Sequence, residues 1–406
     1  MKLLLSFIAG AVVTIGVVYV LSRGPEAKVA QAEPQREVYY PGTEKLGKNE
    51  MRVTACGTGM PSVRPKQAAA CWLVELGNGD KFLFDIGAQS MSRISAMKIP
   101  MDYLDKVFIG HLHTDHMGDL PILWTGSMKM NRTVPLRVWG PNGETPEMGI
   151  KAAIAGLEEF LHWDDESLKG RLDARAFEWQ VTEFDFKGVN EVIYQENGVT
   201  IRSIPAIHSL DGSVSYILEW NGLKFAYSSD TSPNNWWTEY AKGADIAIHE
   251  CFAPAEVLIK KQNYEPTFAL WLSTMAHTSP AQFGKIMAET KPRMAVGYHF
   301  YNDHDTLPIV LEGVRTTYEG PLALATDYMV FNVTPNDIRV RMAAIDEDIW
   351  PLPPAREMVV DESQRQTYGE FTKSGEWMMR DVLEKVWGDV NAKYGTDAKL
   401  PPAEAE

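Results

Sequence analysis

The sequence predicts a layered α/β fold, and three observations support this. Short apolar runs of strand length alternate with helical stretches, and polar residues able to do chemistry directly follow several of these runs. The composition, 45% hydrophobic and 23% charged, is ordinary for a globular protein. We therefore expect a functional site along one edge of the sheets. No repeat with a period of 20–50 residues is visible, which argues against a solenoid or propeller.

Charge and cysteine content exclude several function classes. The chain has 39 Lys and Arg against 54 Asp and Glu, a net charge of −15, and such a surface repels the phosphate backbone of nucleic acids. Three cysteines are too few for a disulfide scaffold or a four-thiolate zinc site. A metal in this protein must therefore be held by histidines and carboxylates.

The N-terminal residues predict export. The run Leu3–Leu21 carries no charge and is long enough to span a bilayer once. The small residues of Ala30-Gln31-Ala32 also suit a signal peptidase, so residues 1–25 are either a cleaved signal peptide or a single inner-membrane anchor. Either interpretation predicts a periplasmic or otherwise extracytoplasmic protein. Residues 26–49 are polar and contain proline, which is typical of a linker.

The folded body is expected over residues 50–335, beginning with a strand at Met51–Gly57. An Asn-Gly turn at Asn78 and Gly79 between two apolar runs predicts a hairpin of Cys71–Leu76 with Lys81–Asp85. The run Val107–Gly110 leads directly to His111. In the second half we expect a helix over Ser279–Thr290 and strands near residues 199–204, 215–218, 225–228, 246–248 and 294–296.

Two regions depart from this alternation. Residues 144–196 combine a helical apolar period with acidic and aromatic residues, and we interpret them as an insertion over the site. Residues 336–406 are expected to form a C-terminal appendage with helical character from Glu370 to Lys393.

The block His111-Leu112-His113-Thr114-Asp115-His116 is the strongest chemical signal. In an extended segment His111 and His113 point to the same side, and the following turn directs Asp115 and His116 to a second position. Imidazole and carboxylate ligands in such a cluster suit zinc. Three further residues follow apolar runs: His208, Asp230 and His299. We predict one ion bound by His111, His113 and His208, and a second by Asp115, His116 and His299, with Asp230 bridging both.

In this order, and with Asp85 in the block Phe84-Asp85-Ile86-Gly87, these residues resemble the metallo-β-lactamase superfamily from about Arg52 to Val333. The resemblance implies an αββα sandwich with a dinuclear site. Asp230 stands where β-lactamases of the cysteine-ligand type have Cys, and His113 stands where flavodiiron reductases have Glu. Both departures favour a hydrolase that binds two Zn²⁺ ions.

Shorter blocks resemble the branch of tRNase Z and the zinc arylsulfatases. They are Gly57-Thr58-Gly59, Trp139-Gly140-Pro141, Ser228-Ser229-Asp230-Thr231, Ala247-Ile248-His249-Glu250 and His277-Thr278-Ser279. The Arg-Asn pair of tRNase Z is replaced here by residues 65–68, Pro-Lys-Gln-Ala. The opening block and the long tail also resemble metallo-hydrolases from guanitoxin biosynthesis clusters.

The sequence therefore predicts an exported dinuclear zinc hydrolase that cleaves a small-molecule phosphodiester or sulfate ester by attack of a metal-bridging hydroxide. Asp115, Asp85, Glu250 and His277 are the predicted catalytic residues, with His277 protonating the leaving group and Asp85 orienting a ligand histidine. For His277 the alternative is a residue that merely leads a helix, and for Glu250 it is a supporting pair with His249. A tRNase Z-like endonuclease and a non-catalytic metal-binding protein remain alternative functions.

Two weaker predictions concern aromatic residues and cysteines. An aromatic-lined pocket would favour a small organic ester over a polymer, and the candidates near predicted loops are Trp163, Trp236, Trp237, Trp271, Phe300 and Tyr301. Cys56 and Cys71 lie on adjacent predicted strands, where an oxidising compartment would permit a disulfide.

Overall fold

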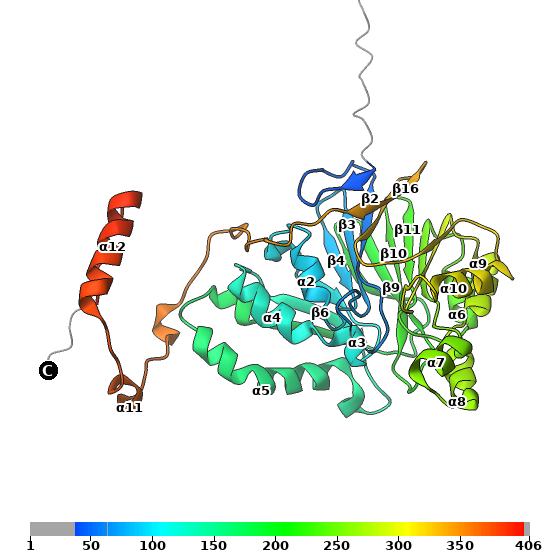
Figure 1. Cartoon of the computed structure of the whole chain (residues 1–406), viewed down its shortest axis with the longest axis horizontal. Coiled ribbons are helices and arrows are strands. Elements are labelled where there is room, and N and C mark those ends of the chain that lie inside the picture. Colours follow the sequence, from blue (N-terminus) through cyan, green and yellow to red (C-terminus); the bar gives the residue numbers. More distant parts are fainter. Residues whose placement is uncertain (1–36, 63, 402–406) are drawn as a thin grey trace, which may run out of the picture. The chain divides into compact units, whose positions relative to one another are not determined.

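The computed structural model describes residues 37–62 and 64–401 (Figure 1). The predicted signal or anchor over residues 1–25 lies outside the described residues. Met1–Tyr39 forms one compact unit, in which strand β1 (Val38–Tyr39) is described, and Tyr40–Glu406 forms the other. Within residues 37–62 and 64–401, no helix has both the length and the apolar character needed to cross a bilayer.

Two β-sheets form the centre of the larger unit (Figure 1). The first contains, in spatial order, β16 (Ile338–Ala343), β15 (Met329–Val333), β2 (Met51–Gly57), β3 (Cys71–Leu76), β4 (Lys81–Phe84), β5 (Lys106–Phe108), β6 (Leu136–Pro141) and β7 (Trp179–Phe184). The second contains β14 (Leu322–Leu324), β13 (Met294–Tyr298), β12 (Ile246–Glu250), β11 (Leu223–Tyr227), β10 (Val214–Trp220), β9 (Val199–Pro205) and β8 (Glu191–Glu196).

Helices cover the outer faces of both sheets. The first half contributes α2 (Ser90–Ser95), α3 (Thr114–Met117), α4 (Leu120–Lys129) and α5 (Ile150–Leu168). The second contributes α6 (Asn235–Tyr240), α7 (Ala255–Gln262), α8 (Pro266–Trp271), α9 (Pro280–Thr290) and α10 (Leu307–Arg315). A π-helix, Leu272–Ala276, continues α8.

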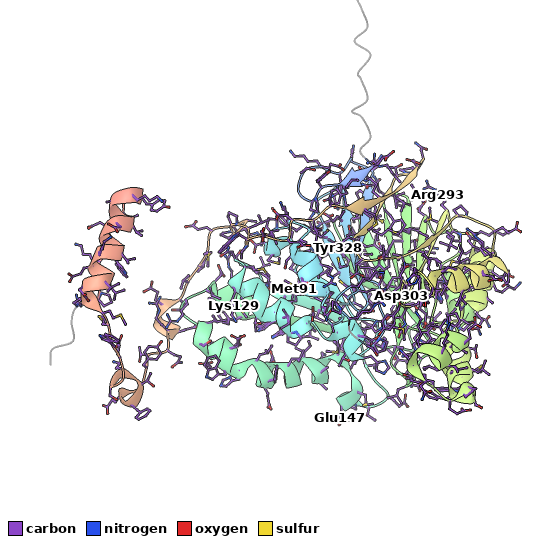
Figure 2. All side chains as sticks on the ribbon, in the orientation of Figure 1. Met91, Lys129, Glu147, Arg293, Asp303 and Tyr328 are labelled. Carbon is purple, nitrogen blue, oxygen red and sulfur yellow. The ribbon has the colours of Figure 1, made fainter. Side chains whose placement is uncertain are left out.

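Three apolar clusters hold these layers together. One fills the space between the sheets and includes Trp72, Phe84, Phe108 and Tyr216, all fully buried. The others lie beneath α2, α4 and α5 on one side and beneath α6, α9 and α10 on the other. Side chains fill the space between the layers in Figure 2, where Arg293 is labelled at the start of β13 and pairs with Asp245 at 2.6 Å. The predicted αββα metallo-β-lactamase sandwich is therefore confirmed.

Local sequence signals correctly predicted most central strands. The hairpin at Asn78 and Gly79 pairs β3 with β4 in antiparallel register, and Gly79 adopts the positive φ of 100° that the turn needs. Strands β9 to β13 coincide with the predicted runs of the second half, and α9 with the predicted helix. Ser279 begins α9 with a capping box to Gln282.

The region 144–196 is more closely integrated than the predicted insertion. Its helix α5 buries Ile150, Ile154 and Leu161 against the first sheet, as the apolar period predicts. Its two strands are missing from the sequence interpretation: β7 pairs with β6 in the first sheet, and β8 pairs with β9 in the second. Both are edge strands with mixed burial, so their apolar alternation is too weak to read from the sequence.

The C-terminal region also begins later than residue 336, because β16 (Ile338–Ala343) pairs with β15. Beyond it, the chain runs alongside the first half: Asn131 donates to the Leu352 carbonyl at 2.8 Å, and the Ala174 N–H donates to the Val359 carbonyl at 2.9 Å. The remaining helices are α11 (Glu370–Lys373) and α12 (Arg380–Tyr394), and neither contains a buried residue.

Candidate metal centre

The predicted ligand residues lie at the ends of strands from both sheets. In the first sheet β4 and β5 are parallel, so Asp85 and His111 leave the sheet at the same edge. In the second sheet β11, β12 and β13 are parallel, which brings Asp230, Glu250 and His299 to one edge. The two edges face each other across the sandwich, and all seven predicted ligand side chains converge there.

Three histidines form the first group. His111 Nε2 lies 3.0 Å from His113 Nδ1, and His208 Nε2 lies 3.2 Å from the same His113 atom. His111 and His208 are buried, whereas His113 is exposed to solvent. Three imidazole nitrogens directed at one point form the donor set that a zinc-type cation prefers.

Two carboxylates and two histidines form the second group. His116 Nε2 is 3.4 Å from Asp115 Oδ2 and 3.2 Å from Asp230 Oδ1, while His299 Nε2 is 3.2 Å and 3.3 Å from the same two oxygens. The other Asp230 oxygen, Oδ2, lies 3.8 Å from His208 of the first group. Asp230 therefore stands between the two groups, where a bridging ligand would have to be.

Unpaired buried atoms show that these residues fit cations. Among the described residues His116 Nε2 and Asp230 Oδ1 have no hydrogen-bond partner, although both are buried and directed at each other. Burial without a partner is costly unless another group completes the site. A divalent cation between nitrogen and oxygen donors would do so.

The electrostatics of the pocket also favour cations. Burial lowers the pKa of His208 to about 4, and burial together with the neighbouring His116 holds the pKa of His111 well below its usual value. Burial opposes ionisation of Asp230, but His116 and His299 lower its pKa well below the ordinary value. For His111, His208 and Asp230 these are the protonation states that a metal requires. At His116, in contrast, burial opposes protonation, but the carboxylates of Asp230, Asp115 and Asp85 raise the pKa.

Asp85 supports the second group from behind. Its Oδ2 lies 2.6 Å from His116 Nδ1 and accepts hydrogen bonds from the hydroxyls of Tyr227 at 2.6 Å and Ser229 at 2.8 Å. Its Oδ1 accepts from the Gly110 N–H at 2.7 Å. A proton on His116 Nδ1 leaves Nε2 free to face the centre, so Asp85 orients this ligand.

His277 and Glu250 form a third group at the same edge. His277 Nδ1 lies 3.0 Å from Glu250 Oε2, and the backbone N–H groups of Thr231 and Thr278 donate to the same carboxyl group. Phe252 stacks on the His277 ring at a centroid distance of 3.9 Å. Burial and the charge of Asp230 raise the pKa of Glu250, while burial lowers that of His277. His277 Nδ1 also lies 3.8 Å from Asp230 Oδ2, so the ring is held by Glu250 beside the carboxylate that the two ligand groups share.

The backbone is strained at this edge. Asp85, Ser229 and His299 adopt φ values of 57°, 50° and 71°, which non-glycine residues rarely do. Gly110 is needed for a different reason, which is space. A Cβ at this position would lie 2.3 Å from Ser229 Oγ, so glycine permits the close approach of the two halves. Strained residues held in place by surrounding structure cluster at functional sites.

The aromatic residues and cysteines singled out in the sequence lie in different environments. Trp236 and Trp271 line a pocket beside His208, whereas Trp237 and Phe300 are buried in the core and Trp163 is exposed on α5. The three cysteines are free and buried, so the structure contains no bridge between Cys56 and Cys71. The His249 ring packs against Trp237, and its Nδ1 lies 2.7 Å from the Glu250 carbonyl oxygen.

Sequence reasoning missed three contributors to the site. Tyr227 lies in an apolar strand and looks like core, and Ser229 was noted only as part of a motif. The Ala276 carbonyl, 3.1 Å from His208 Nδ1, is a backbone group with no sequence signal at all. Only their position beside Asp85 or His208 gives these groups a role.

Comparison with known proteins places the chain in a family. Residues 51–258, about half of the chain, match the family described as anti-Pycsar protein Apyc1. The chain belongs to this family. Ribonuclease Z of Mycobacterium avium (strain 104) is 27% identical over 209 residues, which cover 49% of this chain and 69% of that protein.

Solved structures share the fold of this Apyc1-family protein. The metallo-β-lactamase fold protein YhfI of Bacillus subtilis aligns with a TM-score of 0.53 at 18% identity, covering 70% of this chain and all of YhfI. The short form of human tRNase Z aligns with a TM-score of 0.50 at 18% identity, covering 69% and 98% of the two chains. With the ribonuclease Z relatives, these findings confirm the resemblance: the protein is a metal-dependent hydrolase of the metallo-β-lactamase superfamily.

Proposed function

We propose that this protein is a dinuclear zinc phosphodiesterase that acts on a small organic ester. The observation that carries the proposal is the pair of ligand groups joined by Asp230, whose two oxygens are directed to His116 and His299 on one side and to His208 on the other. A phosphodiester suits such a centre because it has two non-bridging oxygens for two adjacent cations.

The residues divide the work as follows. His111, His113 and His208 would hold one cation, and Asp115, His116 and His299 the other, with Asp230 shared. Bound there, two cations would polarise the ester and lower the pKa of water towards neutrality. Glu250 fixes the His277 ring through Nδ1, which leaves Nε2 to give a proton to the departing oxygen. Asp85 keeps His116 in the tautomer that a ligand needs.

A small substrate is favoured over RNA on charge and shape. The net charge is −15, and the pocket beside His208 has a volume of about 440 Å³ with mostly apolar walls. The ribonuclease Z relatives support cleavage of a phosphodiester bond, so a tRNase Z-like endonuclease is the second candidate. We further propose that any anti-Pycsar role suggested by the family description would depend on this hydrolytic site. Export to the periplasm, by a signal or anchor in residues 1–25, also remains a proposal.

The test is hydrolysis of a chromogenic panel by protein with quantified zinc. We expect metal-dependent turnover of bis(4-nitrophenyl) phosphate, and little turnover of aryl sulfate, lactone, β-lactam or a tRNA precursor. Asp115→Asn should lose one equivalent of zinc, because it removes a ligand. His277→Gln should keep both zinc ions and lose turnover by about 10²-fold, because it removes a proton donor without a ligand.

Each alternative has its own signature in this panel. Turnover of the sulfate alone would show a sulfatase, and cleavage of the tRNA precursor alone would favour the endonuclease. Two bound zinc ions with no turnover of any substrate would favour a non-catalytic metal-binding protein.

A further inference from the structure

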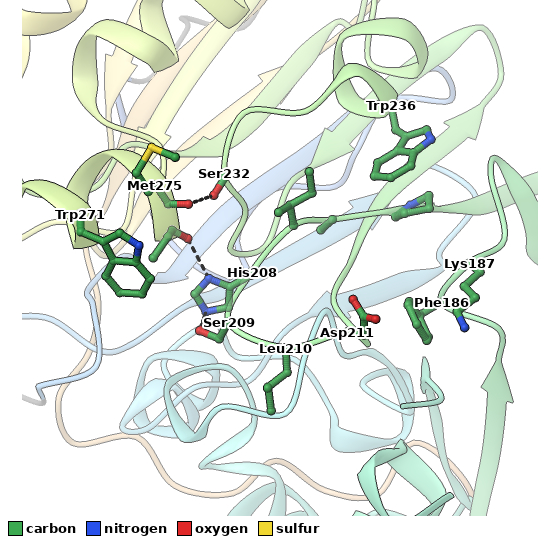
Figure 3. A pocket seen from close by; sticks show the side chains of 14 residues that line it. Phe186, Lys187, His208, Ser209, Leu210, Asp211, Ser232, Trp236, Trp271 and Met275 are labelled. Atoms are coloured by element: carbon green, nitrogen blue, oxygen red, sulfur yellow. Dashed lines mark hydrogen bonds between the residues drawn. The ribbon is translucent and has the colours of Figure 1, made fainter. Parts of the chain in front are cut away.

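A pocket opens directly beside the candidate metal centre (Figure 3). Its volume is about 440 Å³, within the usual range for small-molecule sites. His208 lines this pocket and also belongs to the three-histidine group, so the two sites are continuous. A substituent on an ester held at the centre would therefore extend into the pocket.

The pocket wall is apolar and unusually exposed. Leu210 and Met275 are each 65% exposed, Trp271 is 53% exposed and Ile207 is 49% exposed, and all four line the opening. Soluble proteins rarely gather exposed large apolar side chains around one opening unless a ligand or partner covers them. The charged residues that line the wall are Lys187 and Asp211, and their charges are opposite, so the wall carries no net charge for a second anionic group.

The shape of the pocket favours an extended flexible group over a single planar ring. Trp271 and Trp236 lie on opposite sides of His208 in Figure 3, so their indoles do not face each other as the two walls of a stacking clamp. The wall also contains aliphatic and thioether side chains, including Leu210 and Met275, which adapt to flexible chains.

One element connects this wall to the metal ligands. The π-helix Leu272–Ala276 contributes Met275 to the pocket, and Ser232 Oγ donates to the Met275 carbonyl. The next carbonyl, of Ala276, lies 3.1 Å from His208 Nδ1 and orients that imidazole, and His277 follows immediately. π-Helical turns are rare and are often found at functional sites. Occupancy of the pocket and orientation of His208 thus depend on the same short segment.

We propose that this pocket binds the alkyl chain of an amphiphilic phosphodiester, with the phosphate at the metal centre and the chain along Leu210, Trp271 and Met275. The proposal rests on the phosphodiesterase function proposed above and specifies its substrate class. In the reaction, the oxygen of one water bonds to phosphorus and one ester P–O bond breaks. The departing oxygen takes a proton, so a phosphodiester and water give a phosphate monoester and an alcohol.

The experiment compares 4-nitrophenyl phosphodiesters whose second ester group is methyl, butyl or octyl, each below its critical micelle concentration. We expect kcat/KM to rise with chain length, by at most about fourfold for each methylene that leaves water, until the pocket is filled. Trp271→Ser and Met275→Ser should each flatten this rise, measured as the ratio of octyl to methyl kcat/KM. Trp163→Ser is the matched control, because Trp163 is 81% exposed but lies on α5 and does not line the pocket.

A binding measurement complements turnover. Calorimetric titration with octylphosphonate and methylphosphonate should show tighter binding of the octyl compound to the wild type and to Trp163→Ser, and a smaller difference in the two pocket variants. Hydrolysis of all three esters at equal kcat/KM would overturn the alkyl-chain proposal and leave the phosphodiesterase intact, whereas hydrolysis of none would overturn the proposed function. A dimer that dissociates in Trp271→Ser, with no dependence on chain length, would show that the apolar rim is an interface between copies.

Discussion

Asp85 accepts hydrogen bonds from three directions and contacts one ligand imidazole. The hydroxyls of Tyr227 and Ser229 and the N–H of Gly110 surround its two oxygens, and His116 Nδ1 lies 2.6 Å away. Tyr298 extends this chain, since its hydroxyl donates to Tyr227 at 3.1 Å. The hydroxyls of Tyr227 and Ser229 fix the position of the Asp85 carboxylate. The orientation of His116 therefore depends on side chains that are not themselves predicted ligands.

Tyr227→Phe should weaken zinc binding about tenfold, because loss of this hydroxyl loosens Asp85 and, through it, His116. The affinity would be measured by competition with a chromophoric chelator. Tyr194→Phe is the control: it also removes a hydroxyl from a largely buried tyrosine, but that hydroxyl contacts Glu196, outside the site. Equal zinc affinity in Tyr227→Phe and the wild type would contradict a positioning role for Tyr227.

At the scale of elements, strand β16 is bonded to the chain that precedes β2. Arg341 on β16 forms two hydrogen bonds to the Glu44 carboxylate, at 3.0 Å and 2.8 Å, and its guanidinium is buried. A bidentate pair with one buried partner is stronger than a typical surface ion pair. The hydrogen bond from Arg341 lowers the pKa of Glu44 below its ordinary 4.5, although burial opposes this.

Glu44→Gln should lower the free energy of unfolding by about 1 kcal/mol at neutral pH. A carboxyl group whose folded pKa is lowered stabilises the fold above its unfolded pKa, and that stability is lost as pH falls through the folded value. The difference from wild type should therefore be complete at pH 6–8 and shrink below about pH 4.5. Urea unfolding at several pH values measures it.

Glu144→Gln is the matched control for Glu44→Gln. Glu144 also pairs with a cation, Lys187 at 3.1 Å, but both of these side chains are well exposed. It should leave unfolding unchanged. An equal loss in the two variants, or a Glu44→Gln effect that grows at low pH, would contradict the assignment.

Elements also differ in how well their own sequences predict them. The central strands β9 to β13 and the hairpin of β3 with β4 have clear apolar runs, because both of their faces are buried. The edge strands β7 and β8 have one solvated side and mixed burial, so the pattern that marks a strand is diluted.

At the scale of the whole molecule, the candidate centre joins the two halves of the sandwich. His111, His113, Asp115 and His116 follow β5 of the first sheet, whereas His208, Asp230 and His299 follow strands of the second. A cation bound by ligands from both halves binds the folded state only, and so it stabilises the complete sandwich.

Removal of zinc with a chelator should therefore lower the melting temperature. Free zinc at 100 times its Kd should raise the free energy of unfolding again, by about 2.7 kcal/mol per site. Differential scanning calorimetry across a zinc series measures this shift. Zinc should raise the melting temperature of the Asp230→Asn variant less than that of the wild type, because the substitution removes the ligand shared by both groups. An equal shift in both proteins would show that zinc binds elsewhere.

The sequence by itself determined the parts of this protein that depend on neighbours along the chain. The spacing of His111, His113, Asp115 and His116 places four ligands within six consecutive residues. Apolar runs define the strands that precede His208, Asp230 and His299. With the resemblance to the metallo-β-lactamase superfamily, this was enough to predict the fold and the set of candidate ligands.

Only the tertiary structure decided which distant groups meet. The contact of His277 with Glu250, the hydroxyl of Tyr227 on Asp85, and the carbonyl of Ala276 on His208 join residues from 27 to 142 positions apart. The pocket lined by Trp236 and Trp271 likewise needs residues from four segments of the chain. The physical reason is that such contacts depend on how two sheets pack face to face and on where each strand ends, and no local pattern along the chain encodes either.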